Sequence, residues 1–169
     1  MSRLLSSASV VGFSGSRSVV PERSVSSAVA ALSPGCRVLV GCAAGVDGFV
    51  RSLVPGAEVF AVSSGRWGRG RGAFAGRSAA VVRAVAAGGG VWVSFPSGGC
   101  PVGLVPSLSQ SRCFGGFGSG SWASAAFAAG LGVPVLLWLP AGVVPPAWGF
   151  VAGGGGWFLL APASQLSLL

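Results

Sequence analysis

Short apolar runs alternate with longer stretches of small and polar residues along the chain. Each run is shorter than an ordinary helix and is bounded by Gly, Pro or Ser, which favours buried strands. The predicted strands are residues 8–13, 37–40, 58–62, 91–95 and 133–139. The stretches between them carry helix start and stop signals, such as Pro21 and the glycines that follow Ala129, and predict four helices. These helices are residues 21–32, 46–53, 77–87 and 121–129.

Regular alternation of strands and helices predicts the fold class. We expect an α/β protein with a Rossmann-like open, mostly parallel sheet and helices on both faces, in a single domain of residues 1–169. The core is predicted at about 8–139. An apolar C-terminal extension, residues 140–169, is expected to add one edge strand near 157–161.

Three stretches need separate predictions. The strand at 58–62 is apolar after its first residue, which predicts a strand covered on both faces. Residues 66–76 interleave arginines with glycines, and we expect a mobile or ligand-ordered loop there instead of a packed helix. Residues 97–120 are expected to form a long Gly-, Ser- and Pro-rich connection.

Composition bears on the surface and the partners. Hydrophobic residues make up 51% of the chain and charged residues 8%, so much of the surface must be small or apolar. No charge follows Arg112, but prolines and glycines interrupt every window of about 20 residues that a transmembrane helix would need. We therefore favour an apolar contact surface over membrane insertion, and predict a cytoplasmic homo-oligomer without a signal peptide.

Cysteine spacing bears on metals and redox state. Cys36, Cys42, Cys100 and Cys113 include no CxxC pair, and no histidine is present to complete a mixed zinc site, so no metal is expected. Cys36 and Cys42 lie at opposite ends of one predicted strand, which makes a disulfide between them awkward. We expect four free, mostly buried thiols in a reducing compartment.

All eleven cations are arginines, and they outnumber three acids to give a net charge of +8. The absence of Lys, His and Tyr excludes chemistry that needs a histidine base, a lysine Schiff base or a tyrosine acid. The planar fork of arginine pairs with phosphate oxygens, which favours ligands that carry phosphate. A GC-rich coding bias that enriches Gly, Ala and Arg together explains the choice of arginine equally well.

Three glycine-rich segments carry most of the candidate chemistry: Gly12–Arg17, Gly41–Gly48 and Gly115–Ser121. Each is expected to follow a buried strand, and loops at the carboxyl ends of parallel strands converge on one crevice. Backbone N–H groups in such loops and at helix N-termini bind phosphate. The predicted ligand-binding residues are Ser14, Gly15, Ser16, Arg17, Gly45, Asp47, Arg77, Ser78, Gly118, Ser119, Gly120 and Ser121.

The order of these motifs, followed by an Ala-rich helix and Gly132-Val133-Pro134-Val135, resembles the SLOG superfamily of Rossmann-like nucleotide-binding proteins. That superfamily includes the DNA-processing protein A fold and the lysine-decarboxylase-like phosphoribohydrolases. The resemblance runs from about Val10 to Leu139. It implies a nucleotide or nucleotide-derived ligand at the strand ends, with no other cofactor required.

The chain departs from the phosphoribohydrolase members at one motif. Their pattern PGGxGTxxE ends in a glutamate that supports glycosidic cleavage, whereas Trp122, Ala123 and Ser124 follow the matching turn here. Asp47 is the only carboxylate expected near the crevice, and acid–base work at a glycosidic bond usually needs one. We therefore assign no catalytic residue and predict a binding or sensing module, with hydrolysis as an alternative that release of a free base would support.

Asp47 and Arg77 each have two interpretations. Asp47 accepts a ribose hydroxyl or orients Arg17, or else it caps or stabilises the first turn of a helix. Arg77 clamps a phosphate at the start of the helix predicted at 77–87, or it is solvated.

A second hypothesis is a single-stranded DNA-binding protein that resembles DNA-processing protein A. Arginines on and near the loop predicted at 66–76 would follow the strand, and its binding would weaken with salt. The residues assigned to this alternative are Arg66, Trp67, Arg69, Arg71 and Arg83, with Arg77 beside them. Trp67, Phe74 and Trp122 either stack on a base or belong to the core.

Overall fold

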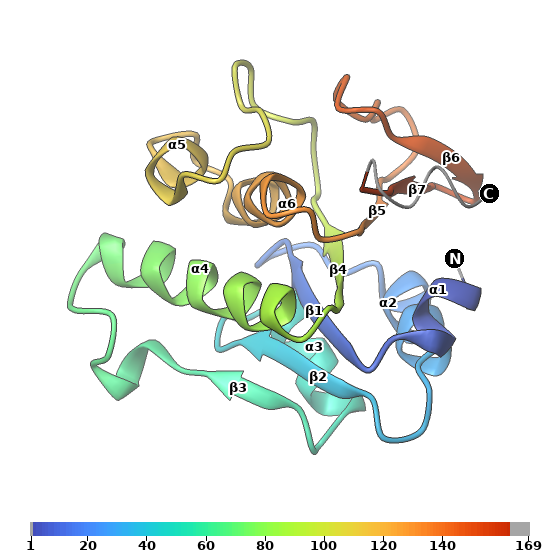
Figure 1. The fold of residues 1–169 in the computed structure, drawn as a ribbon, viewed down its shortest axis with the longest axis horizontal. Coiled ribbons are helices and arrows are strands. Elements are labelled where there is room, and N and C mark those ends of the chain that lie inside the picture. Colours follow the sequence, from blue (N-terminus) through green and yellow to red (C-terminus); the bar gives the residue numbers. More distant parts are fainter. Residues whose placement is uncertain (1, 163–169) are drawn as a thin grey trace.

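The computed structural model describes residues 2–162, which form an α/β domain around one seven-stranded sheet (Figure 1). The sheet order is β3-β2-β1-β4-β5-β7-β6. The strands are β1 Val10–Gly15, β2 Arg37–Gly41, β3 Glu58–Phe60, β4 Val91–Phe95, β5 Val135–Trp138, β6 Val151–Gly154 and β7 Trp157–Leu160. β1 to β5 pair in parallel, while β7 is antiparallel to β5 and to β6. The predicted Rossmann-like, mostly parallel sheet is confirmed.

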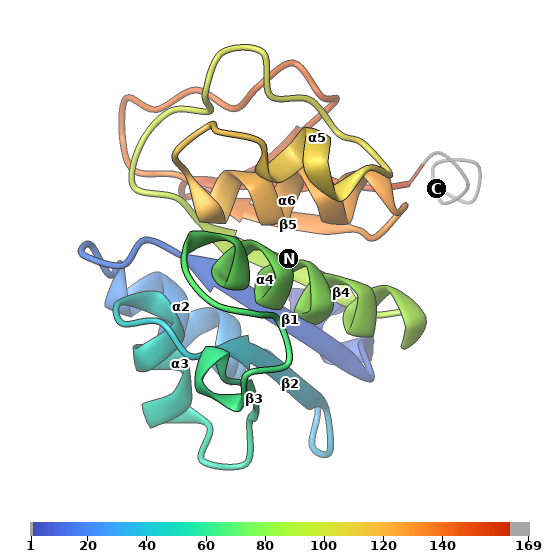
Figure 2. The ribbon, with the colours of Figure 1, turned by 90° about the vertical axis from the view of Figure 1, so that its left-hand side faces the viewer.

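Helices cover both faces of the sheet, as predicted. They are α1 Ser2–Ser7, α2 Glu22–Ala30, α3 Val46–Leu53, α4 Arg71–Ala87, α5 Gln110–Phe114 and α6 Gly120–Gly130, with a 3-10 turn at Val62–Ser64. The first three lie on one face, and α4 and α6 lie side by side on the other (Figures 1 and 2).

Successive side chains of a strand point to opposite faces of the sheet, so the core consists of two layers, one on each face. Val38 and Val40 of β2 pack in the layer beneath α2 and α3, whereas Leu39 packs with Trp92 of β4 beneath α4 and α6. β1, β2 and β4 are buried along most of their length on both faces, which explains why these parallel strands are mostly apolar.

α4 begins six residues earlier than predicted, so residues 71–76 are helix and not loop. Ala73, Arg77, Val81 and Val85 are all buried, and their spacing of four places them on one stripe of the helix. Burial of that stripe against the sheet outweighs the low helix propensity of the local glycines.

Three further predictions, on the strand at 58–62, the C-terminal extension and the connection at 97–120, are wrong. β3 ends at Phe60 and is an edge strand with Val59 44% exposed, so it is not covered on both faces. The extension adds a hairpin, β6 and β7, in place of one edge strand. The connection at 97–120 contains α5, so the third glycine segment follows a helix and not a strand.

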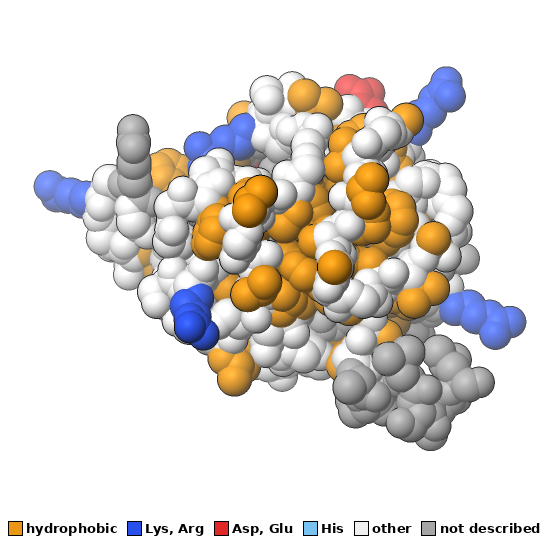
Figure 3. All heavy atoms as spheres, turned by 90° about the horizontal axis from the view of Figure 1, so that it is seen from above, with side chains coloured by type: hydrophobic (Ala, Val, Ile, Leu, Met, Phe, Trp, Pro, Cys, Tyr) orange, Lys and Arg blue, Asp and Glu red, His pale blue; other side chains and the backbone are white. Residues whose placement is uncertain are grey.

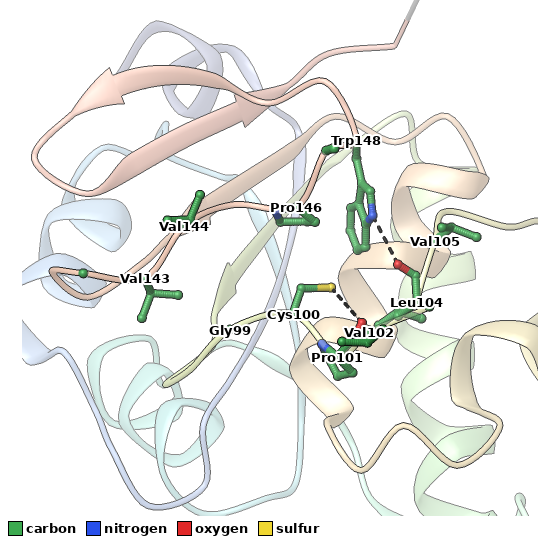
Figure 4. Close-up of a pocket in the computed structure, with 13 residues that line it drawn as sticks. Gly99, Cys100, Pro101, Val102, Leu104, Val105, Val143, Val144, Pro146 and Trp148 are labelled. Atoms are coloured by element: carbon green, nitrogen blue, oxygen red, sulfur yellow. Dashed lines mark hydrogen bonds between the residues drawn. The ribbon is translucent and has the colours of Figure 1, made fainter.

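One face of the molecule is apolar and bears no charge along its loops. Hydrophobic side chains gather over its centre, with arginines toward its margins (Figure 3). An apolar groove of about 600 Å³, formed by residues 99–105, 142–144 and 146–148, opens there. Trp148 donates from Nε1 to the Leu104 carbonyl across it (Figure 4). None of the helices within residues 2–162 is long and apolar enough to cross a bilayer.

Candidate functional site

A polar cavity of about 350 Å³ lies at the carboxyl ends of β1, β2 and β4, the edge that faces the viewer in Figure 2. It is lined by Ser14, Gly15, Ser16, Arg17, Ala43, Asp47, Arg77, Ser78, Ser97, Gly118, Ser119, Gly120, Ser121 and Ser124. Every predicted site residue except Gly45 lines it. The structure therefore brings the three glycine segments together at one place, while ligand binding there stays a prediction.

Arg77 and Asp47 form a buried ion pair in the wall of the polar cavity. Nη1 of Arg77 lies 3.3 Å from Oδ2 of Asp47, and both side chains are 7% exposed. The guanidinium lies over Gly41 at the end of β2, where a Cβ would overlap Nη1. Arg77 is thus neither solvated nor at the start of its helix, because α4 begins at Arg71.

Asp47 lies in the first turn of α3, where it organises the second glycine segment. Its Oδ2 also accepts from the Ala43 N–H at 3.3 Å. Burial raises the pKa of the Asp47 carboxyl, and the Arg77 guanidinium and the Ala43 N–H oppose that rise. The residue at the N-cap position is Gly45, so Asp47 is not the cap, but its predicted place in the first turn of the helix is confirmed. The carboxylate pairs with Arg77 instead of Arg17.

Gly45 joins the first two glycine segments although it does not line the cavity. Its φ is +67°, a conformation that favours glycine, and a Cβ there would overlap the Ser16 carbonyl oxygen. That oxygen accepts from the Val46 N–H at 3.0 Å. The start of α3 is therefore held against the loop that carries Arg17.

A chain of hydroxyl groups links β1 and β4 to the start of α6. Ser14 Oγ and Ser94 Oγ are 3.1 Å apart in the core. Ser94 Oγ also donates to the Ser121 carbonyl at 3.3 Å. The contact positions the N-terminus of α6 at the cavity, where the first N–H groups of a helix have no intrahelical acceptor.

The sequence did not reveal three residues that line the polar cavity or hold the second glycine segment. Ser97 lies two residues after the end of β4, and the rule that placed the other loops at strand ends would have found it. Ser124 lies one turn into α6 and donates to the Gly120 carbonyl at 2.8 Å. Arg51 donates to the carbonyls of Gly41 and Ala43, and its place in the last turn of α3 gave no sign of that contact.

Four residues of the nucleic-acid hypothesis, Arg66, Trp67, Arg69 and Arg83, do not line the polar cavity, whereas Arg77 does. Arg66 and Arg69 are exposed, whereas Arg83 donates to Oε1 of Gln110 at 3.0 Å. The backbone of Arg71 begins α4. Burial removes Arg77 from any continuous basic stripe. Binding of nucleic acid by the others stays a prediction.

The three candidate stacking residues differ in their surroundings. Trp122 is 1% exposed and donates from Nε1 to the Gly98 carbonyl, so it belongs to the core. Trp67 packs on Phe60 with ring centroids 6.2 Å apart. Phe74 is 40% exposed, and the Arg17 guanidinium lies 5.1 Å from its ring centroid.

The four cysteines are free thiols, and only Cys113 is buried; the other three are half-buried, contrary to the prediction that most would be buried. Burial raises the pKa of the Cys100 thiol to about 11. The described residues contain no group of three or more Cys, Asp or Glu side chains that could hold a metal ion.

Fold and site together define a Rossmann-like α/β protein with a polar cavity at the carboxyl ends of its parallel strands. Comparison of the chain with protein-family models, with curated proteins and with solved structures finds no match.

Proposed function

We propose that the protein binds a nucleotide or nucleotide-derived ligand whose phosphate lies in the polar cavity. The observation that carries the proposal is the state of Arg77: it lines the cavity, it is buried, and its Nε has no hydrogen-bond partner among the described residues. A buried donor left unpaired costs about 1–3 kcal/mol. An anionic ligand in the cavity would supply acceptors that the guanidinium lacks.

The remaining lining has the chemistry of an anion site. Arg17 adds a second guanidinium, and seven serines contribute hydroxyls. The N-terminus of the eleven-residue helix α6 contributes N–H groups and its dipole. One carboxylate opposes these groups, and it is paired with Arg77. The resemblance of the same motifs to the SLOG superfamily supports a nucleotide over a simple anion.

A role in binding or sensing fits this lining better than cleavage. The turn at residues 118–121 is followed by Trp122, Ala123 and Ser124, so the glutamate of the phosphoribohydrolases has no counterpart there. Oδ2 of Asp47 faces the Arg77 guanidinium and the Ala43 N–H. An oxygen held in this way is poorly available for proton transfer.

The proposal is tested by isothermal titration of the whole chain with AMP, GMP, CMP, UMP, cyclic AMP and cyclic GMP. We expect Arg17→Gln to weaken binding of the best ligand by about ten-fold or more, because charge-assisted hydrogen bonds to phosphate are lost. Arg17 is exposed, so the fold is expected to survive.

Arg23→Gln is the matched control. It removes the same charge from an exposed position in α2 that does not line the cavity, and it is expected to leave affinity nearly unchanged. Absence of heat with every ligand, from a sample shown to be folded by circular dichroism, would contradict the proposal.

We also propose that a second copy of the chain covers the uncharged face. Val102 is 98% exposed and Val144 77% exposed beside the apolar groove, and large exposed apolar patches mark contact sites. Because the chain carries a net charge of +8, two copies repel one another through their arginine-bearing faces. No charged residue follows Arg112, so the loop at 142–148 meets its counterpart without that repulsion.

Sedimentation velocity tests this contact. The wild type is expected to sediment as a symmetric oligomer, and the double variant Val102→Glu/Val144→Glu as a monomer, because two carboxylates per copy would be buried unpaired. Val59→Glu, on the edge strand β3 and outside the apolar groove, is the control and is expected to leave the oligomer intact. A monomeric wild type at high micromolar concentration would disprove the contact.

A further inference from the structure

A second cavity, the aromatic pocket, adjoins the polar cavity. It measures about 570 Å³, and its own lining includes Phe74, Phe114, Phe117 and Cys113. Arg17, Ser78 and residues 118–120 line both cavities. The two hollows therefore share a wall, and one small molecule can occupy both.

The two cavities differ in chemistry. The polar cavity is lined by hydroxyls, guanidinium groups and glycine backbone, whereas three phenylalanines line the aromatic pocket. Phe74 is 40% exposed, so part of its ring is accessible to a ligand in the aromatic pocket. Phe114 is held by an edge-to-face contact with Phe127 of α6, with ring centroids 6.1 Å apart. Part of the aromatic wall is thus fixed by the core.

Arg17 lies at the junction of the two cavities. The central carbon of its guanidinium lies over the Phe74 ring, 5.1 Å from the centroid, and the same side chain lines the polar cavity. A guanidinium attracted to an aromatic face still has N–H groups that can donate hydrogen bonds to an anion. This arrangement suits a ligand in which a flat ring lies one short linker away from a phosphate.

We infer that the aromatic pocket is the base site, so that the ligand is a mononucleotide with its base on Phe74 and Phe117 and its phosphate in the polar cavity. The inference rests on the proposed function. Beyond that function, we infer that contacts to the base contribute to affinity as well as contacts to the phosphate. Each cavity has a volume within the range of about 300–1,000 Å³ that is usual for small-molecule sites.

The test compares ligands that differ only in the ring. AMP, GMP, CMP and UMP are titrated beside ribose 5-phosphate, which keeps the sugar and phosphate but has no base. We expect the best mononucleotide to bind about ten-fold or more tightly than ribose 5-phosphate, and Phe74→Ala to abolish most of that difference. Alanine is a strong helix former, so this exposed position of α4 is expected to tolerate it.

A second variant distinguishes the loss of contacts to the base from a displacement of Arg17. Phe74 also supports Arg17, so Phe117→Ala is expected to weaken mononucleotide binding while the affinity for ribose 5-phosphate stays the same. Phe150→Ala truncates a phenylalanine that lines neither cavity, and it is expected to change neither affinity.

The possible failures are distinguishable. If mononucleotides and ribose 5-phosphate bind equally well and neither Phe74→Ala nor Phe117→Ala changes this, the base site is disproved while the phosphate site stands. If neither kind of ligand binds the folded protein, the proposed function itself is disproved.

Discussion

Replacing Asp47 with alanine is expected to lower the free energy of unfolding by about 3–5 kcal/mol, because it leaves a buried guanidinium without its counter-ion. The Arg77 side chain is 7% exposed, and Nη1 is directed at Asp47 Oδ2. With its Nε already unpaired, Arg77 has few alternative acceptors among the described residues. Urea denaturation followed by tryptophan fluorescence measures the loss.

The exposed ion pair supplies the matched control. Arg37 and Glu58 lie 2.8 Å apart, closer than the buried pair, but their side chains are 62% and 50% exposed. Glu58→Ala is therefore expected to lower the free energy of unfolding by about 1 kcal/mol or less. Equal losses from the two alanine variants would show that burial does not govern the Asp47 effect.

A double variant separates the structural role of the pair from its binding role. Asp47→Leu/Arg77→Met removes both charges, and apolar replacement of a buried pair is often neutral or stabilising. We expect most of the unfolding free energy to return while nucleotide binding is lost. A double variant that is as unstable as Asp47→Ala would contradict this account.

The ion pair of Asp47 and Arg77 is also expected to make the free energy of unfolding depend on pH. Burial raises the pKa of Asp47 above its value in the unfolded chain, so proton uptake by this carboxyl favours the fold below the unfolded pKa. That increment is lost as pH rises through the raised pKa of the folded state, and above it the ionised Asp47 remains as the counter-ion that Asp47→Ala removes. The double variant is expected to lack that step in a plot of unfolding free energy against pH.

The strands and loops near the middle of the sheet could be predicted from sequence because local signals agree with burial there. Val91–Phe95 and Val46–Leu53 have the predicted boundaries, since each begins directly after a glycine and ends close to a proline. The convergence of residues 14–17 with residues 118–121 followed from the rule for strand ends.

The environment of Arg77 could not be predicted, because it depends on a contact between distant segments. An arginine among glycines has the local composition of a loop, yet it lies on the stripe that Ala73 and Val81 place against the sheet. Its counter-ion is 30 residues away in sequence. Only the packing of α4 across the ends of β1 and β2 brings the two together.

Replacing Gly45 with alanine is expected to lower the free energy of unfolding by about 3 kcal/mol or more, because two penalties coincide. The φ of +67° with a ψ of −130° is a strained conformation for any residue with a side chain. The added Cβ would also overlap the Ser16 carbonyl oxygen, a backbone atom that cannot rotate away. Either penalty alone would weaken the bond from the Val46 N–H to that oxygen.

Gly48→Ala, three residues along in the same helix, separates this effect from glycine replacement in general. Its Cβ would meet Arg51 and the Ala43 carbonyl oxygen at ordinary contact distances, 3.6 and 3.7 Å. The change is expected to stabilise α3 by about 0.5–1 kcal/mol, since alanine favours helix over glycine. Opposite signs for the two variants, with nucleotide binding lost only in Gly45→Ala, would show that this glycine holds Arg17 at the junction of the two cavities. Equal effects would instead assign the loss to helix α3 alone.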